Sequence, residues 1–232
     1  MKAHVTIKDL ARELNISPST VSRALKDHPD ISLETKNLVI EMASQLGYVP
    51  NYVARNLSSK RSNTIGLVVP KVAHHFFSEV IEFIYENTFK NKYEIIMTVS
   101  HESPEHEIHH LQSLLSMRVD GLLISVTEKT KNSEIFKTIK KRGVPLVFFD
   151  RVIENIGFSC ITSDDEGGAL DAVSYLVKAG YTKIAHLAGY EYTSIGRLRK
   201  SGFIKGIKKH KLEIPDEWII EVASMSKVAI RA

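Results

Sequence analysis

The chain has a single cysteine, Cys160, among its 232 residues. One thiol cannot form an internal disulfide, so the sequence excludes a disulfide-stapled fold and favours a reducing compartment. No apolar run approaches the ~20 residues that a membrane-spanning helix needs. The amino terminus enters a polar helical pattern directly, so we expect no signal peptide. Together these absences predict a cytoplasmic protein that does not contact a membrane.

Sequence patterns of the common catalytic sites are also missing. There is no glycine-rich phosphate loop, no nucleophile elbow and no cluster with the spacing of metal ligands. The histidine pairs 74–75 and 109–110 lack a third partner at a suitable spacing. Gly167 and Gly168 follow two acidic residues, but we interpret them as a close-packing position at a helix start. We therefore expect no enzyme, no metal and no cofactor.

What is present is an ordinary globular composition, with 43% hydrophobic and 25% charged residues. The length allows one small and one medium-sized domain. Residues 1–61 contain nine Lys and Arg against six Asp and Glu, a net charge of +3, whereas the whole chain carries +4. An excess of positive charge at one end favours a polyanionic partner there.

The first segment, residues 6–47, predicts three short helices. Thr6 and Asp9 have the spacing of a capping box at the start of the first helix. Ser17 caps the second helix, and Pro18 takes its first position, where the missing N–H of proline costs nothing. Two short helices joined by a tight turn are typical of a helix-turn-helix, whose second helix can enter a major groove.

The outer face of the second helix carries small hydroxyl side chains and Arg23. Small residues let the backbone approach DNA closely, and an arginine can bind guanine through two hydrogen bonds. The alternative is an ordinary three-helix bundle, which predicts a long or acidic outer face on this helix. The observed face favours DNA binding.

At this point a family resemblance emerges. Residues 5–11 and 17–25 resemble the DNA-binding head of the lactose/galactose repressor (LacI/GalR) family, and residues 47–57 are similar to its hinge. The resemblance implies a hinge helix in the minor groove, with Leu57 as an apolar wedge that kinks the duplex. The DNA contacts that we expect are Thr6, Ser17, Pro18, Ser19, Thr20, Ser22, Arg23, Asn51, Ala54 and Leu57.

The same resemblance assigns roles within the head. Pro18 and Ser19 match base-reading positions, Arg23 matches a base reader later in the helix, and Thr6 and Ser22 match phosphate contacts. Proline has no hydrogen-bonding side chain, so base specificity at position 18 is apolar or absent. An isolated helix as short as the hinge is unstable in water. We therefore expect the hinge to fold only when paired on DNA; the alternative is that its leucine packs against the sensor domain.

From residue 64 onward, short apolar runs alternate with helical patterns. The run 64–69 is apolar almost throughout, as in a strand buried on both faces of a parallel sheet. Such alternation predicts a doubly wound α/β domain. We expect strands at 64–69, 93–99, 121–126, 144–149, 158–162 and 183–187, with helices at 77–90, 104–117, 132–142 and 166–179.

Ligands of such sheets bind beyond the carboxyl ends of the strands. That rule points to residues 70–76, Ser100, Ser125, 150–151 and Asp164, where aromatic and charged groups suit a small polar ligand such as a sugar or nucleobase. The family resemblance selects the same edge and adds an arginine farther along the chain. The effector contacts that we expect are Phe76, Phe77, Ser125, Asp150, Asp164 and Arg199.

Three of these residues have competing interpretations. Phe77 fits the core as well as it fits a ligand platform. Asp150 can cap a helix or pair with Arg151 instead of binding an effector. Arg199 can be a solvated residue at the start of a helix, which the sequence places at 199–210.

The sensor of this family has two similar lobes, and the chain passes to the second near Asp164. Here the second lobe is expected to hold a helix, a strand, a second helix and a short approach at 218–221, before residues 222–232 depart from the family pattern. One strand and two helices cannot cover both faces of a parallel sheet. A truncated gene product is the favoured explanation; a deliberate fragment and a lobe completed in an oligomer are the others.

The sequence thus predicts a helix-turn-helix domain (1–49), a hinge and linker (50–63), and a periplasmic-binding-protein-like α/β domain with an N-terminal lobe (64–163) and a partial C-terminal lobe (164–232). The implied function is a transcription regulator, a repressor that binds a near-palindromic operator in double-stranded DNA as a homodimer. A small-molecule effector such as a sugar controls it. The alternatives are a regulator without effector control and a small-molecule binding module only.

Overall fold

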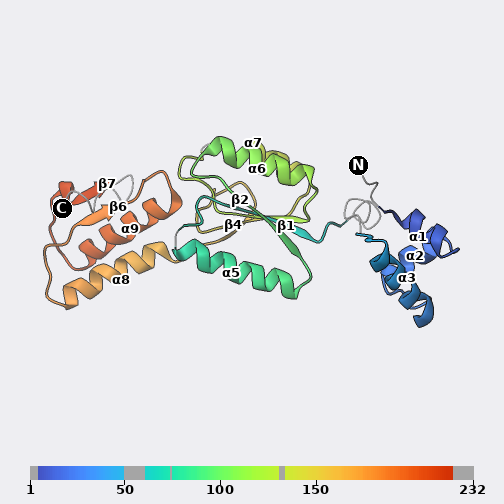
Figure 1. Ribbon diagram of the computed structural model, residues 1–232. Coiled ribbons are helices and arrows are strands. Elements are labelled where there is room, and N and C mark those ends of the chain that lie inside the picture. Colours follow the sequence, from blue (N-terminus) through green and yellow to red (C-terminus); the bar gives the residue numbers. More distant parts are fainter. Residues whose placement is uncertain (1–4, 50–60, 74, 131–133, 222–232) are drawn as a thin grey trace. The chain divides into compact units, whose positions relative to one another are not determined.

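The chain forms two compact units, residues 1–60 and 61–232, which are described separately (Figure 1). No helix in the described part of the chain is long and apolar enough to cross a bilayer. The computed structural model describes residues 5–49, 61–73, 75–130 and 134–221.

The first unit is a bundle of three helices, α1 (Ile7–Glu13), α2 (Pro18–Leu25) and α3 (Leu33–Gln45). Each helix starts at a hydroxyl side chain that accepts a hydrogen bond from the backbone amide three residues later. These capping residues are Thr6, Ser17 and Ser32. The three helices share one apolar core made of Leu10, Ala11, Val21, Ala24, Val39 and Ala43. The predicted three-helix head, with Ser17 capping a helix that Pro18 opens, is confirmed.

The second unit begins with a five-stranded sheet in which every pairing is parallel. Its strand order is β2-β1-β3-β4-β5, the order of a doubly wound fold. All five strands end at one edge, which we call the carboxyl edge. The strands are β1 (Thr64–Val69), β2 (Glu94–Val99), β3 (Gly121–Ile124), β4 (Leu146–Phe149) and β5 (Ser159–Ile161).

Helices cover both faces of this sheet. Helix α5 (His75–Lys90) lies on one face, and helices α6 (Pro104–Ser116) and α7 (Glu134–Lys141) lie on the other (Figure 1). The two faces have separate apolar clusters. In β1, a Cβ at Gly66 would lie 2.7 Å from the side chain of Leu122 in β3 and 2.9 Å from that of Leu114 in α6, so the glycine leaves room for both leucines.

The second lobe is built from α8 (Asp165–Lys178), β6 (His186–Ala188), α9 (Ser194–Lys209) and β7 (Ile219–Glu221). Strands β6 and β7 pair in parallel as a two-stranded sheet. The short segment predicted at 218–221 therefore contains a strand. The start predicted for α9, residue 199, is wrong by one and a half turns. The helix begins earlier because Thr193 caps it, accepting a hydrogen bond from the amide of Gly196 (3.1 Å).

Helices α8 and α9 pack together at two glycines of α9. A Cβ at Gly202 would collide with the backbone oxygen of Glu166, and one at Gly206 would lie 2.7 Å from the Cβ of Val173. The close approach lets the two helices share an apolar cluster made of Val173, Ile184, Phe203 and Ile207. The second lobe therefore has a core of its own.

We predict opposite effects for two Gly→Ala substitutions in this lobe. Gly202→Ala should lower the free energy of unfolding of the second unit by about 1–3 kcal/mol, because the new methyl group has no room. Gly168→Ala, in α8, is the matched control: nothing lies within 4 Å of a Cβ there. It should stabilise the unit by about 0.4–1 kcal/mol through the unfolded state. Urea unfolding followed by circular dichroism measures both, and equal midpoints would contradict the packing described.

Candidate DNA-binding and effector sites

The start of α2 presents a cluster of hydroxyl groups. Ser17 Oγ accepts a hydrogen bond from the Thr20 amide (3.0 Å) and lies 2.7 Å from Ser19 Oγ and 2.8 Å from Thr20 Oγ1. Pro18 and Ser19 are exposed beside it, and Ser22 is half-buried one turn later. Hydroxyls and backbone amides at a helix start are donors for a phosphate group. The sequence-predicted contacts on α2 therefore share one surface.

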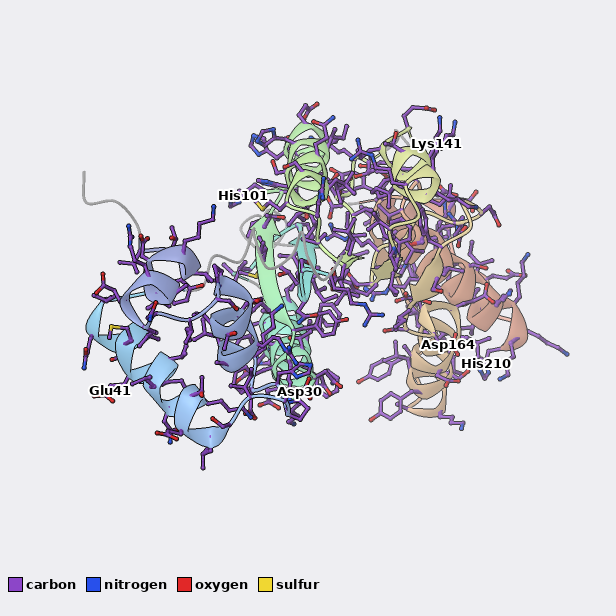
Figure 2. All side chains as sticks on the ribbon, turned by 90° about the vertical axis from the view of Figure 1, so that its right-hand side faces the viewer. Asp30, Glu41, His101, Lys141, Asp164 and His210 are labelled. Carbon is purple, nitrogen blue, oxygen red and sulfur yellow. The ribbon has the colours of Figure 1, made fainter. Side chains whose placement is uncertain are left out.

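Arg23 is the cation on this surface, and it already has a partner. Its guanidinium forms an ion pair with Asp30, in the loop between α2 and α3 (Figure 2), and lies 3.5 Å from His28 Nδ1. The Arg23 side chain is 45% exposed and that of Asp30 62%, so water screens the pair. The ion pair uses Nη2 of Arg23, so a base or phosphate that binds this nitrogen would have to replace Asp30. No sequence signal pointed to Asp30.

Thr6, predicted to contact phosphate, serves first as a cap. Its hydroxyl donates to Asp9 Oδ2 (2.7 Å), and its amide donates to the same oxygen (2.9 Å). These hydrogen bonds from Thr6 lower the pKa of Asp9. The predicted capping box is confirmed. The predicted hinge contacts Asn51, Ala54 and Leu57 lie outside the described residues.

At the carboxyl edge, Ser125 and Asp150 meet as the strand-end rule predicted. Ser125 is fully buried after β3, and its Oγ donates to Asp150 Oδ2 (3.2 Å) after β4. Burial raises the pKa of Asp150, against the opposing effect of the neighbouring Arg151. The φ of Asp150 is +60°, a left-handed conformation of the kind that gathers at functional sites.

Arg151 does not take Asp150 as its ion-pair partner. Its Nη1 donates to both carboxylate oxygens of Glu102 (2.8 and 3.0 Å), and its Nη2 lies 3.4 Å from Glu128 Oε1. The Glu128 amide also donates to Glu102 (3.0 Å). The Arg151 and Glu102 side chains are only 19% and 15% exposed, so this network ties the ends of β2, β3 and β4 together.

Glu107 lies behind this network and is completely buried. It accepts hydrogen bonds from the Thr127 amide (2.7 Å) and the Thr130 hydroxyl (2.9 Å), and so holds the loop after β3. Burial raises its pKa to about 7, although both hydrogen bonds oppose the shift. The sequence contained a signal that we missed, since Glu107 is an acid in the apolar stripe of α6 that continues at Leu111 and Leu114.

The two adjacent phenylalanines at the start of α5 have different environments. Phe77 is 5% exposed and packs among Leu67, Val69 and Phe149, so the structure places it in the core and not on the cleft surface. Phe76 is 41% exposed and touches Phe77 edge to face, with ring centroids 5.3 Å apart. Of the two predicted effector contacts, Phe76 alone presents a ring to solvent.

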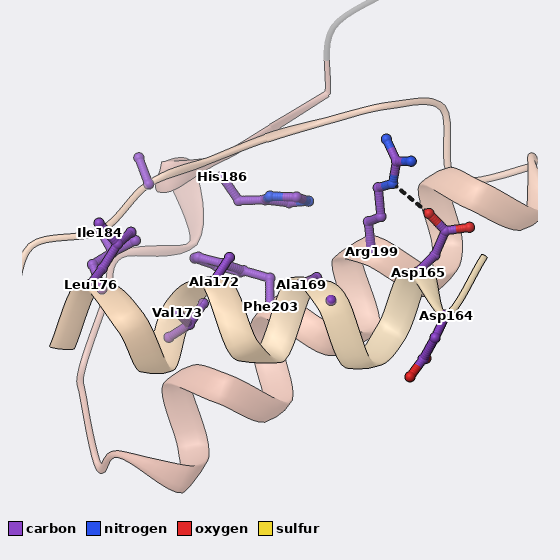
Figure 3. Close-up of a pocket in the computed structure, with 12 residues that line it drawn as sticks. Asp164, Asp165, Ala169, Ala172, Val173, Leu176, Ile184, His186, Arg199 and Phe203 are labelled. Carbon is purple, nitrogen blue, oxygen red and sulfur yellow. Dashed lines mark hydrogen bonds and ion pairs between the residues drawn. The ribbon is translucent and has the colours of Figure 1, made fainter. Parts of the chain in front are cut away.

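Asp164 and Arg199 line one cavity of about 420 Å³ in the second lobe (Figure 3). Asp164 caps α8 by accepting from the Gly167 amide (2.9 Å). Arg199 Nε donates to Asp165 Oδ1 (2.7 Å). The far end of the cavity is apolar, and there His186 stacks on Phe203 with ring centroids 4.8 Å apart. Arg199 is not at the start of a helix, because α9 begins five residues earlier, but its side chain is 57% exposed, as the solvated alternative predicted.

A second cavity, of about 610 Å³, was not anticipated from the sequence. Its lining includes Glu102, Glu105, Lys129 and Tyr192. The Tyr192 ring stacks on Tyr190, with centroids 4.9 Å apart. Both tyrosines follow β6, so applying the strand-end rule to the second lobe would have found them. Within the described ranges, no three His, Cys, Asp or Glu side chains are grouped to hold a metal ion.

Each of the two units matches a known protein family. Residues 6–51 match the family described as "Bacterial regulatory proteins, lacI family". Residues 62–232 match "Periplasmic binding proteins and sugar binding domain of LacI family". The chain is 32% identical to catabolite control protein A of Priestia megaterium over 94% of its own length. It is 31% identical to the probable transcriptional repressor ExuR of Bacillus subtilis, also over 94%.

The solved structures agree with these matches. A lac repressor dimer bound to operator and the anti-inducer ONPF superposes with a TM-score of 0.78 and 26% identity over 94% of this chain. The chain spans 65% of that repressor, 65% of catabolite control protein A and 64% of ExuR. The likeness therefore extends from the helical head through the first lobe and into the second.

The buried Glu107 predicts a specific pH dependence of stability. Its folded pKa of about 7 lies above the ordinary value of 4.5. Between these values the folded state binds a proton that the unfolded state has lost, so stability falls as pH rises through this window and is level above it. The fall is about 3 kcal/mol for this group. Glu107→Gln should remove it, because the amide needs no proton to stay neutral.

Urea unfolding at a series of pH values between 4.5 and 8 measures this contribution. Glu105→Gln is the matched control, because Glu105 is exposed on the same helix and should leave the fall in place. An unchanged slope in Glu107→Gln would show that the buried carboxyl does not titrate in this range.

Proposed function

Because the chain belongs to the LacI family of bacterial regulatory proteins, we propose that it is a sequence-specific DNA-binding transcription regulator that acts as a repressor. The observation that carries the proposal is the outer face of α2, where a hydroxyl cluster and one exposed arginine stand over a closed three-helix core. Such a face fits a major groove without steric conflict. The protein acts by binding, not by catalysis, and works in the cytoplasm.

In this proposal the helical head, residues 1–49, binds operator DNA. The start of α2 approaches the phosphate backbone and the first bases, and Arg23 exchanges Asp30 for a base edge or phosphate. Residues 50–63 form the hinge and linker, with Leu57 as the minor-groove wedge. The proposed DNA contacts are Thr6, Ser17, Pro18, Ser19, Thr20, Ser22, Arg23, Asn51, Ala54 and Leu57.

The second unit is the proposed effector domain, with lobes at 64–163 and 164–232. The carboxyl edge and the start of α9 supply hydroxyl, carboxylate and aromatic groups for a small polar ligand such as a sugar. The proposed contacts are Phe76, Ser125, Asp150, Asp164 and Arg199, with Phe77 supporting Phe76 from the core. Arg197 of α9 donates to Glu154 of the first lobe (2.7 Å), so a ligand that shifts α9 also acts on the first lobe.

We propose a homodimer as the active form, since a near-palindromic operator requires two heads. An exposed apolar surface on α5 and the neighbouring edge strand β2 supports it. Phe83, Tyr85 and Phe89 are 69%, 57% and 67% exposed, and Met97 of β2 is 43% exposed. Tyr85 and Phe89 stack on each other with ring centroids 6.2 Å apart, and an exposed aromatic pair of this kind is typical of an association surface.

We predict that Arg23→Ala lowers the affinity for the protein's operator by about 10- to 100-fold, the ~1–3 kcal/mol of an arginine–base contact, and relaxes sequence preference. Asp30→Asn should raise the affinity for the operator, because it releases the Arg23 guanidinium from its ion pair. Fluorescence anisotropy with DNA from upstream of the protein's own and neighbouring genes, over a series of salt concentrations, measures both.

Arg142→Ala removes an exposed arginine from the second unit and is the charge-matched control. Equal losses for Arg142→Ala and Arg23→Ala would show that only net charge matters. If the unsubstituted chain protects no site in a DNA footprint, the proposed regulator function is overturned. The alternative of a small-molecule binding module would then remain. Protection that a panel of sugars never alters would favour the regulator without effector control.

A further inference from the structure

The last residues of the proposed linker are held by one carboxylate of the second unit. Asp120 Oδ1 accepts hydrogen bonds from the amide (2.7 Å) and the hydroxyl (3.0 Å) of Ser62, and Asp120 Oδ2 accepts one from the Asn63 amide (3.0 Å). Ser62 is only 5% exposed. Two successive backbone amides and a hydroxyl therefore converge on a side chain that lies 58 and 57 positions farther along the sequence. We call this arrangement the Asp120 anchor.

The backbone turns at the same point. The φ of Asn63 is +49°, a left-handed conformation, and a turn of this kind can direct successive amides toward one anion. The neighbouring strands hold the turn as well: the Glu94 amide of β2 donates to the Asn63 oxygen (2.8 Å), and the Asp120 amide donates to the Thr64 oxygen (2.8 Å). Asp120 directly precedes β3, which pairs with β1. Contacts with β2 and β3 therefore set the direction in which the chain enters β1.

The place of the anchor in the chain gives it a mechanical role. The two units divide between residues 60 and 61, so the anchor holds the first residues on the side of the second unit. Hydrogen bonds to a carboxylate are roughly twice as strong as those between neutral groups. Without Asp120, the amide and the hydroxyl of Ser62 would both lose their acceptor. Each residue that is released adds conformational freedom to the connection between the head and the sheet.

We propose that Asp120 is a positioning residue for operator binding: it gives the linker a fixed starting point on the second unit, so that both heads of a dimer can bind their half-sites together. The inference rests on the proposed regulator and its homodimer. Binding of the second head is intramolecular, and its effective concentration depends on the length and stiffness of the connection. A connection that starts at a fixed point has less freedom to lose on binding than one that is loose. Asp120 acts through the linker and not by contact with DNA.

Asp120→Ala in the full chain tests the anchor on two DNA fragments, an operator located by footprinting and a fragment with a single half-site of that operator. The variant should bind the complete operator about tenfold or more weakly, because the released linker must be ordered in both subunits. Its affinity for the single half-site should stay within about twofold of that of the unsubstituted chain, because one head binds without the other. Fluorescence anisotropy measures both affinities. The substitution removes a negative charge, which by itself favours DNA binding, so net charge predicts the opposite change.

Amide hydrogen exchange tests the anchor without DNA. The amides of Ser62 and Asn63 should exchange about 10- to 100-fold faster in Asp120→Ala, the range expected for a lost hydrogen bond to a charged group. Asp120→Asn, of nearly unchanged size, is the second variant should Asp120→Ala fail to fold. Its oxygen can still accept from Ser62, but its NH2 group cannot accept from Asn63. Exchange in this variant should therefore rise at Asn63 more than at Ser62.

Gly202→Ala is the control for stability, because it disturbs helix packing in the same unit but not the anchor. It should leave the ratio of complete-operator to half-site affinity unchanged. Three outcomes would overturn the inference: equal losses on the operator and the half-site in Asp120→Ala, unchanged exchange at residues 62 and 63, or the same change of the ratio in Gly202→Ala.

The same measurements separate this inference from the proposed function. If the unsubstituted chain binds no DNA, the regulator is contradicted, and the role of Asp120 in operator binding is contradicted with it. If the unsubstituted chain binds its operator and Asp120→Ala binds it equally well, only the role of Asp120 is contradicted.

Discussion

The parallel direction of β1–β5 is the constraint on which the second unit depends. Parallel strands all end at one edge, so every crossover leaves the sheet there and the polar residues that stop each strand collect in one place. Glu102, Glu128 and Arg151 follow three different strands and form one ion-pair network. Glu107 then fastens the loop after β3 from behind. The loops at the carboxyl edge are thereby tied to one another and to α6.

Local features of this fold could be predicted from the sequence because their causes are local. A strand buried on both faces must be apolar throughout, which located β1 to within a residue. A hydroxyl cap involves only the capping residue and the three residues after it, so it can be predicted from a short stretch of sequence. The predicted starts of α1 and α2 were confirmed for this reason. The predicted start of α9 was too late because the capping residue, Thr193, lies several residues before the pattern of basic and apolar residues from which the helix was predicted.

Contacts between distant residues could not be predicted. The partner of Arg151 lies 49 residues away, and the adjacent Asp150 was the obvious but wrong candidate. Phe76 and Phe77 differ by 100° around a helix, and periodicity alone does not say which of the two rings turns to the core. Whether a predicted residue at the carboxyl edge faces a ligand or another side chain depends on such pairings. The sequence therefore predicted the sheet edge at which these residues lie, but not what each side chain contacts.

The described part of the second lobe has a two-stranded sheet, β6-β7. A two-stranded sheet is marginal by itself. Here Gly202 and Gly206 bring α9 so close to α8 that the helices bury Val173 and Phe203 between them and the strands. Ile184, just before β6, belongs to this cluster, so the two helices hold the chain where it enters the strand. After β6, the Thr193 hydroxyl donates to the backbone oxygen of Tyr190 (2.7 Å), so the cap of α9 also fixes the chain between β6 and α9.

Paired arginines have different consequences in the two units because of burial. In the head, the Arg23–Asp30 pair is about half exposed, so water already weakens it and a released carboxylate returns to solvent at little cost. In the second unit, the Asp165 and Glu102 side chains are only 6% and 15% exposed, so losing the arginine partner would leave either carboxylate buried and uncompensated. The same type of ion pair is therefore loosely held in the head and structural in the second unit.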